Sequence, residues 1–211
     1  MGTTNSIPDQ LPPTLTPEDA ARRNFYALLA RLFYAGPDRG LLDAVAAMTP
    51  ASTDRADGDV AKALAALAEA AHRADAEEEH QRFDDLFIGA GKAPVTLYVS
   101  HYLVESGREK ILVRLRDDLA ALGLARKDVA REPEDHIAGL CDLMRHLVDQ
   151  GSSEASLAHQ REIFERYLSR SFTPLCDAIL TNVDRGPFFE AVARLAMAFL
   201  VVEAEGFSML A

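Results

Sequence analysis

The stretch that decides the fold is Glu132-Pro-Glu-Asp-His-Ile-Ala-Gly-Leu-Cys-Asp-Leu-Met144, in which three acids and a histidine precede an apolar pattern. Apolar residues then recur at intervals of three and four, which is the spacing of one face of an amphipathic helix. We expect the helix to begin at Pro133, because the first helical position tolerates a missing N–H, and to end at Gly151. Glu134 and Asp135 would then lie at the positive end of the helix dipole.

Helical spacing extends outward from this stretch in both directions. Thr16-Pro17 is typical of a helix start, and a core stripe of leucines and aromatics follows it. Further helices are predicted over residues 38–48, 60–71, 75–87, 105–122, 156–168, 172–180 and 187–204. Only Val95–Val99 has the composition of a strand, and the sequence offers it no partner strand.

These patterns predict an all-α fold, a single compact globular domain of about nine or ten helices. The domain is expected over residues 16–211, after a polar, proline-rich tail at 1–15 that we expect to be mobile. No internal repeat of fixed period occurs, and this disfavours a solenoid.

Composition limits the classes of partner and the compartment. Of 211 residues, 48% are hydrophobic and 26% charged, and the net charge of −11 disfavours nucleic acid and anionic membranes while suiting a basic peptide. The N-terminus lacks the basic and apolar regions of a secretory signal. Cys141 and Cys176 lie on apolar helix faces and have no metal-type spacing. We therefore expect a cytoplasmic protein whose cysteines are core residues.

Sequence motifs for catalysis are weak. The chain has no GxSxG or HExxH string, and the GxGK at residues 89–92 follows no predicted strand. Asp135-His136 resembles the His-Asp pair of metal phosphohydrolases in reversed order, without a second ligand pair. Taken alone, the two residues also fit an ordinary helix start that caps the helix or faces water. We predict no catalytic residue, metal or cofactor, and a metal-dependent phosphohydrolase or nucleotide hydrolase centred on this pair remains an alternative.

Three strings together resemble a known family. They are Phe83-Asp-Asp-Leu-Phe-Ile-Gly89, residues 94–102, and Glu132-Pro-Glu-Asp-His136. Their order is similar to that in the TorD/DmsD/NarJ family of redox-enzyme maturation chaperones, and the resemblance spans most of residues 20–205. Two departures are Ala90, where relatives carry proline, and the lack of tryptophan in the second string. These departures concern ligand specificity.

The resemblance implies a chaperone without chemistry of its own. It would bind the twin-arginine leader, the apo form of a molybdopterin oxidoreductase, or both, and hold the enzyme for cofactor insertion before export. The string Ser-His-Tyr-Leu at 100–103 is most similar to members associated with formate-dehydrogenase-type enzymes. A leaderless assembly factor of the NarJ type for a membrane reductase is a further alternative, and the protein could be a monomer or a dimer.

The resemblance also assigns roles to residues. Asp135 would offer a carboxylate to the leader's arginine pair or to a backbone N–H. The leader-binding surface around it would include His136, Glu132 and Pro133. Apolar contacts to the leader would come from Leu86, Phe87, Pro94 and Tyr98. Leu86 and Phe87 fit the end of a core helix equally well, and that alternative stays open.

Overall fold

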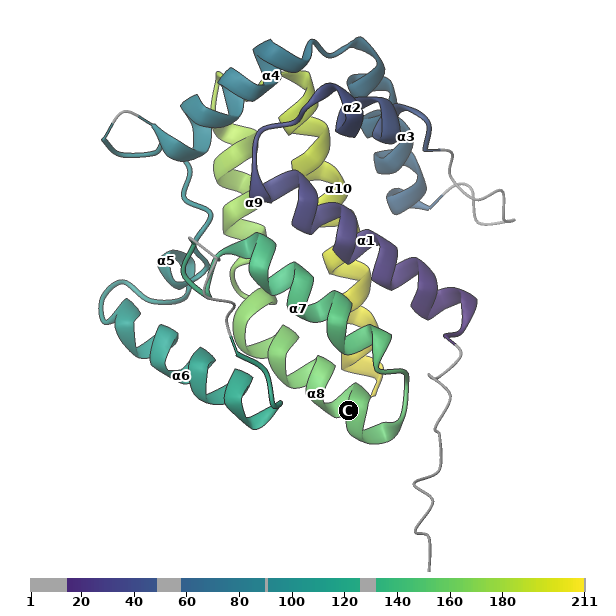
Figure 1. The fold of residues 1–211 in the computed structure, drawn as a ribbon, viewed down its shortest axis with the longest axis vertical. Helices are drawn as coiled ribbons and strands as arrows, with labels where there is room; N and C mark the ends of the chain where they lie inside the picture. Colours follow the sequence, from purple (N-terminus) through teal and green to yellow (C-terminus); the bar gives the residue numbers. More distant parts are fainter. Residues whose placement is uncertain (1–14, 49–57, 90, 126–131, 211) are drawn as a thin grey trace, which may run out of the picture.

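Helix α7 (Ile137–Asp149) lies in the middle of the computed structural model, with α1 (Pro17–Tyr34) packed along it (Figure 1). The structure describes residues 15–48, 58–89, 91–125 and 132–210. Most of α7 is buried, including Leu140, Met144 and Leu147. The predicted apolar face of this helix is therefore the centre of the core.

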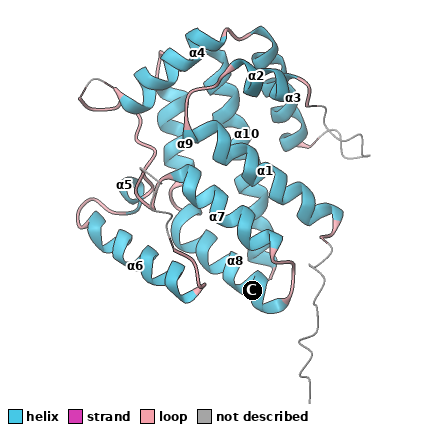
Figure 2. Ribbon diagram, viewed as in Figure 1, coloured by secondary structure: helices cyan, strands magenta, loops and turns pink. Residues whose placement is uncertain are grey.

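The longest helix, α10 (Gly186–Met209), packs mainly against α3 and α9, whose bounds follow, and to a smaller extent against α1. The other elements are α2 (Arg39–Ala46), α3 (Asp59–Arg73), α4 (Ala76–Phe83), α5 (Ser100–Leu103), α6 (Arg108–Ala121), α8 (Glu154–Ile163) and α9 (Phe172–Thr181). Two of them, α4 and α8, continue into five-residue π-helical turns, Asp84–Ile88 (η1) and Phe164–Leu168 (η2). The described residues thus form ten α-helices without a strand, and the prediction of an all-α fold is confirmed (Figure 2).

Side-chain caps set where several helices begin. Thr16 accepts the Asp19 N–H at 3.0 Å, and Asp75 accepts the N–H groups of Glu77 and Glu78 at the start of α4. These bonds satisfy N–H groups that have no partner inside the helix. The helix starts at Thr16-Pro17 and near residue 75 are therefore confirmed.

A buried polar network fastens α1 to α10 and α8. The Arg22 guanidinium donates to both oxygens of Glu203, at 2.7 and 2.9 Å, and to Gln160 at 3.0 Å. The Tyr26 hydroxyl donates to the same carboxylate at 2.9 Å. Burial, followed by the charge of Glu203, raises the pKa of Tyr26. Because all these groups have partners, the network tolerates its low-dielectric setting and fixes how α1 lies on the core.

Three expectations need correction or restriction. The helix predicted to begin at Pro133 begins four residues later at Ile137, with His136 as its cap, so Pro133 is not in the helix. Val95–Val99 forms no strand and pairs with none in the described residues, but Tyr98 makes one isolated antiparallel bridge with His136. A turn closed by the His136 N–H and the Pro133 carbonyl precedes the helix, and the bridge holds His136 itself in extended backbone, so the helix starts only at Ile137. The expected tail at 1–15 lies almost wholly outside the described residues.

The cysteine prediction is confirmed, since Cys141 and Cys176 are buried and free. Among the helices that the structure describes, none has both the length and the apolar character needed to cross a membrane.

Candidate functional site

The backbone joins the three strings to one another. The Val95 N–H donates to the Leu86 carbonyl at 3.0 Å, which links the first string to the second. The second string is linked to the third, because Val99 N–H donates to Asp135 O at 3.0 Å, and to the first residue of α7, because Ile137 N–H donates to Leu97 O at 2.8 Å. Strings far apart in the sequence therefore form one continuous piece of structure.

Gly89, the last residue of the first string, is required by its backbone. Its φ is +63°, a region that residues with a Cβ rarely adopt. A Cβ there would lie 2.9 Å from the carbonyl oxygen of Lys92 and 3.0 Å from the Cα of Ala93. The glycine thus permits the sharp return of the chain toward the second string.

Asp135 and His136 face the protein rather than solvent. Asp135 is only 2% exposed, and one of its carboxylate oxygens accepts the Ser100 N–H at 3.3 Å. His136 is 7% exposed, and its ring caps α7 by accepting the Ala138 N–H on Nδ1 at 3.2 Å. Burial lowers the pKa of His136, while the charges of Glu132 and Asp135 oppose that shift. A neutral ring suits the cap, because Nδ1 needs its lone pair to accept.

Tyr98 and Glu132 continue this arrangement toward the surface. The Tyr98 hydroxyl donates to the Glu132 carboxylate, and the Tyr98 ring meets the His136 ring edge-on at a centroid distance of 5.4 Å. Burial and the bond to Glu132 together raise the pKa of Tyr98 to about 12. The bond to Tyr98 thereby holds the Glu132 carboxylate in place.

A groove of about 870 Å³ lies between α1, α6 and the start of α7. Its lining includes the apolar side chains of Ala27, Ala30, Leu115, Leu119 and Leu143. Charged and polar side chains also line it: Glu132, Glu134, Asp142, Arg31, Arg145 and His146. An apolar cleft of this size with a few polar groups has the usual character of a binding site. We refer to it as the α1/α7 groove.

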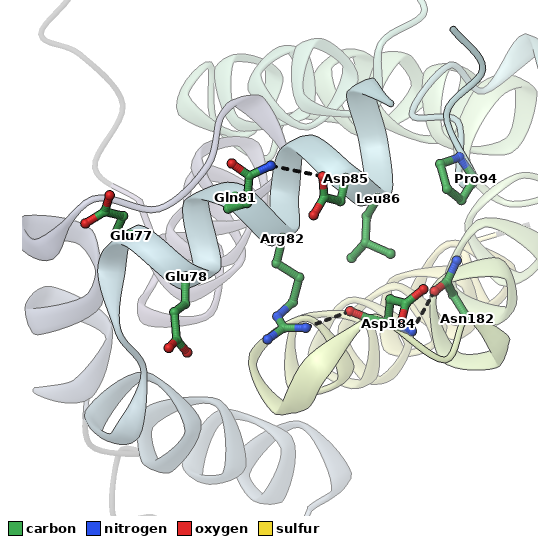
Figure 3. A pocket seen from close by; sticks show the side chains of 9 residues that line it. All are labelled: Glu77, Glu78, Gln81, Arg82, Asp85, Leu86, Pro94, Asn182 and Asp184. Carbon is green, nitrogen blue, oxygen red and sulfur yellow. Dashed lines mark hydrogen bonds between the residues drawn. The ribbon is translucent and has the colours of Figure 1, made fainter. Parts of the chain in front are cut away.

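A second hollow, of about 660 Å³, lies beside α4 and η1 (Figure 3). Leu86 and Pro94 line it together with the carboxylates of Glu77, Glu78, Asp85 and Asp184. Arg82 spans it by donating to the Asp184 carbonyl at 2.9 Å, and it also donates to the carboxylate of Glu79 on its own helix at 3.2 Å. We refer to it as the α4 hollow.

The eight residues predicted to form a binding surface fall in several places. Glu132, Pro133 and His136 line the α1/α7 groove, and Tyr98 is bonded to Glu132. Leu86 and Pro94 line the α4 hollow instead. The remaining two are buried: Asp135, as described, and Phe87, whose ring packs against Phe83 and Phe189. Leu86 is itself only 1% exposed, so the helix-end alternative describes both Leu86 and Phe87.

Sequence reasoning missed part of the groove. It did not select Glu134, which stands inside the third string and whose side chain is 8% exposed. It also missed the contributions of α1 and α6, because their small and apolar residues are indistinguishable from core residues in the sequence. In the part of the chain that the structure describes, no three His, Cys, Asp or Glu side chains gather as a metal site would require.

The fold and the groove define a class of all-helical protein in which the third string, at residues 132–136, leads into the buried helix α7 and also lines an apolar groove. Residues 53–177, more than half of the chain, match the family model described as nitrate reductase delta subunit, and the chain belongs to this family. The predicted TorD/DmsD/NarJ family is thus confirmed. A curated relative is "Chaperone protein TorD" of Aliivibrio fischeri, 30% identical over 133 residues. That match covers 57% of this chain and 60% of the relative.

Proposed function

We propose that this chain is a cytoplasmic chaperone for the maturation of a molybdopterin oxidoreductase, without catalytic activity of its own. It binds the twin-arginine leader of its client, or the apo form, and holds the client until the cofactor is inserted. The family and the relative named as a chaperone support this role. Formate-dehydrogenase-type enzymes are the clients that the 100–103 string favours.

The observation that carries the proposal is that the third string forms part of an apolar groove. The leader's apolar region packs against alanines and leucines of α1, α6 and α7, where burial of apolar surface favours binding. Glu132, held by Tyr98, offers a carboxylate at the same groove. The net charge of −11 attracts a basic peptide and mainly raises its association rate.

The roles of the predicted residues change within this proposal. Asp135 and His136 act by holding the second string to the start of α7, and Glu132, Pro133 and His136 border the bound leader. Leu86 and Phe87 support the fold from the core. The phosphohydrolase alternative gains no support from Asp135 and His136, since both groups are bonded to backbone N–H groups.

The family model favours a second candidate, a NarJ-type assembly factor whose client carries no leader, because its description names a reductase delta subunit. Calorimetric titration with synthetic twin-arginine leaders, each compared with a Lys-Lys version, separates the two candidates. Micromolar or tighter binding to one leader, weakened in its Lys-Lys version, is expected. A folded protein that binds no leader but binds an apo reductase subunit would establish the second candidate instead.

A further inference from the structure

Glu134 already holds an arginine. The Arg116 guanidinium of α6 donates from Nε to one carboxylate oxygen of Glu134 at 2.9 Å and from Nη2 to the other at 3.1 Å. This two-point geometry is the one in which a planar guanidinium matches a carboxylate, and an ammonium group cannot reproduce it. Glu134 therefore has the position and orientation of an arginine receptor.

The two partners are exposed to very different degrees. The side chain of Glu134 is 8% exposed and lines the α1/α7 groove, whereas that of Arg116 is 55% exposed. The carboxylate is thus fixed by its surroundings, while the arginine lies largely in solvent. A guanidinium arriving along the groove could take the place of Arg116 without the carboxylate having to move.

Helix α6 is loosely attached to the rest of the protein. Leu115 is its single fully buried residue, and glycines with positive φ, Gly107 at +75° and Gly123 at +71°, flank it. Apart from its apolar contacts, polar bonds hold it at Arg116 and at Asp118, which accepts from Arg166 and Tyr167. Since Leu115 and Leu119 line the groove, a change at Arg116 alters one wall of the binding site.

We propose that Glu134 is the specificity-determining receptor for an arginine of the client leader, and that Arg116 occupies it until the client arrives. This inference rests on the proposed function and deepens it. The leader's arginine replaces Arg116 at Glu134, and α6 loses one of its polar attachments. In the free protein Arg116 stays bound to Glu134, and a peptide with lysines in place of the arginines displaces it poorly.

The first test compares Arg116→Ala with the wild type in calorimetric titration of a twin-arginine leader. Removing the internal competitor should tighten binding about two- to fivefold, because an ion pair whose arginine lies largely in solvent is worth little. Arg114→Ala is the matched control, since Arg114 is an exposed arginine on the same helix and does not line the groove. Its affinity should equal that of the wild type.

The second test uses Glu134→Gln and measures the affinity ratio between the twin-arginine leader and its Lys-Lys version. The ratio should fall toward one, because the neutral amide no longer favours a guanidinium. A third readout is amide hydrogen exchange in residues 108–121, which should increase in Arg116→Ala and when the wild type binds the twin-arginine leader. Arg114→Ala should leave it unchanged.

The outcomes separate the two proposals. If the wild type binds no leader, the leader-binding part of the proposed function fails and the arginine receptor fails with it. If the wild type binds but Arg116→Ala binds equally or more weakly, the receptor assignment is overturned and the leader-binding function stands. Unchanged discrimination in Glu134→Gln would also overturn it.

Discussion

The α1/α7 groove and the α4 hollow are both lined by residues of the characteristic strings, yet their linings differ. The groove has apolar walls formed by three helices, and Glu132, Pro133 and His136 also line it. The hollow has four carboxylates, and Arg82 spans it (Figure 3). An apolar peptide segment gains free energy by leaving water for the groove, but it gains little in the hollow. The comparison teaches that membership of a string does not by itself place a residue in the groove.

The largest effect on stability is expected from a change at Asp135, which joins the third string to the second. Asp135→Ala removes the buried acceptor of the Ser100 N–H and should destabilise the fold by about 1–3 kcal/mol. Chemical denaturation measures this loss. Asp135→Asn is the matched control, since its amide oxygen still accepts a hydrogen bond. If Asp135→Asn keeps its stability yet loses leader binding, the Asp135 charge contacts the leader directly, and our structural role for it is wrong.

A smaller effect is expected from blocking the groove. Gly139 on α7 lines the groove and is exposed, and a Cβ there meets only an ordinary contact, 3.7 Å from the Glu134 carbonyl oxygen. Gly139→Phe should therefore fold normally and weaken leader binding about tenfold, or ~1.4 kcal/mol, by filling apolar space. Gly206→Phe on α10 is the matched control, because its Cβ position is open and lies outside the groove. Equal affinities in the two variants would place the leader elsewhere.

A still smaller effect should come from protonation of His136. Its folded pKa is lowered below the ordinary 6.5, so the folded state binds the proton less well than the unfolded state. The stability it contributes is complete above pH 6.5 and is lost as the pH falls through the folded pKa. Denaturation curves measured between about pH 7.5 and about pH 5 should show this loss of stability. This range extends about one unit or more to either side of the ordinary histidine pKa. Asn caps a helix without titrating, so His136→Asn should reduce the change of unfolding free energy with pH. If that pH dependence is unchanged, it arises from other groups.

The smallest effect is expected in the α4 hollow. The double variant Glu78→Gln with Asp85→Asn removes two of its carboxylates while preserving their shapes. Leader affinity should change by less than about twofold, because only the long-range attraction of the acidic surface weakens. Titration at low and high salt checks this. A tenfold loss at high salt would move the arginine-binding site from the groove to the hollow.

Several features were predictable from the sequence because they depend on local patterns. Helical spacing predicted the all-α fold, and the residues after Ile137 form the buried face that the pattern indicated. Caps at Thr16 and Asp75 follow from short-range bonds that the sequence specifies directly. The order of the three strings was sufficient to indicate the family, which the comparison with the family model confirms.

Features that depend on contacts between distant residues were not predictable. The helix start at Pro133 was wrong because the Tyr98–His136 bridge holds His136 in extended backbone, and local propensity carries no information about that bridge. The burial of Asp135 and Phe87 likewise depends on partners far along the chain. Acidic and aromatic residues in a characteristic string can serve either the fold or a surface.

The sequence by itself determined the helices, their apolar faces, the acidic charge and the family, since each depends on residue type and near-neighbour spacing. Only the tertiary structure decided that the third string borders a groove with α1 and α6, that the second string pairs with it, and that Glu134 holds Arg116. The physical reason is that these bonds join residues distant in sequence, and their formation depends on how the helices pack.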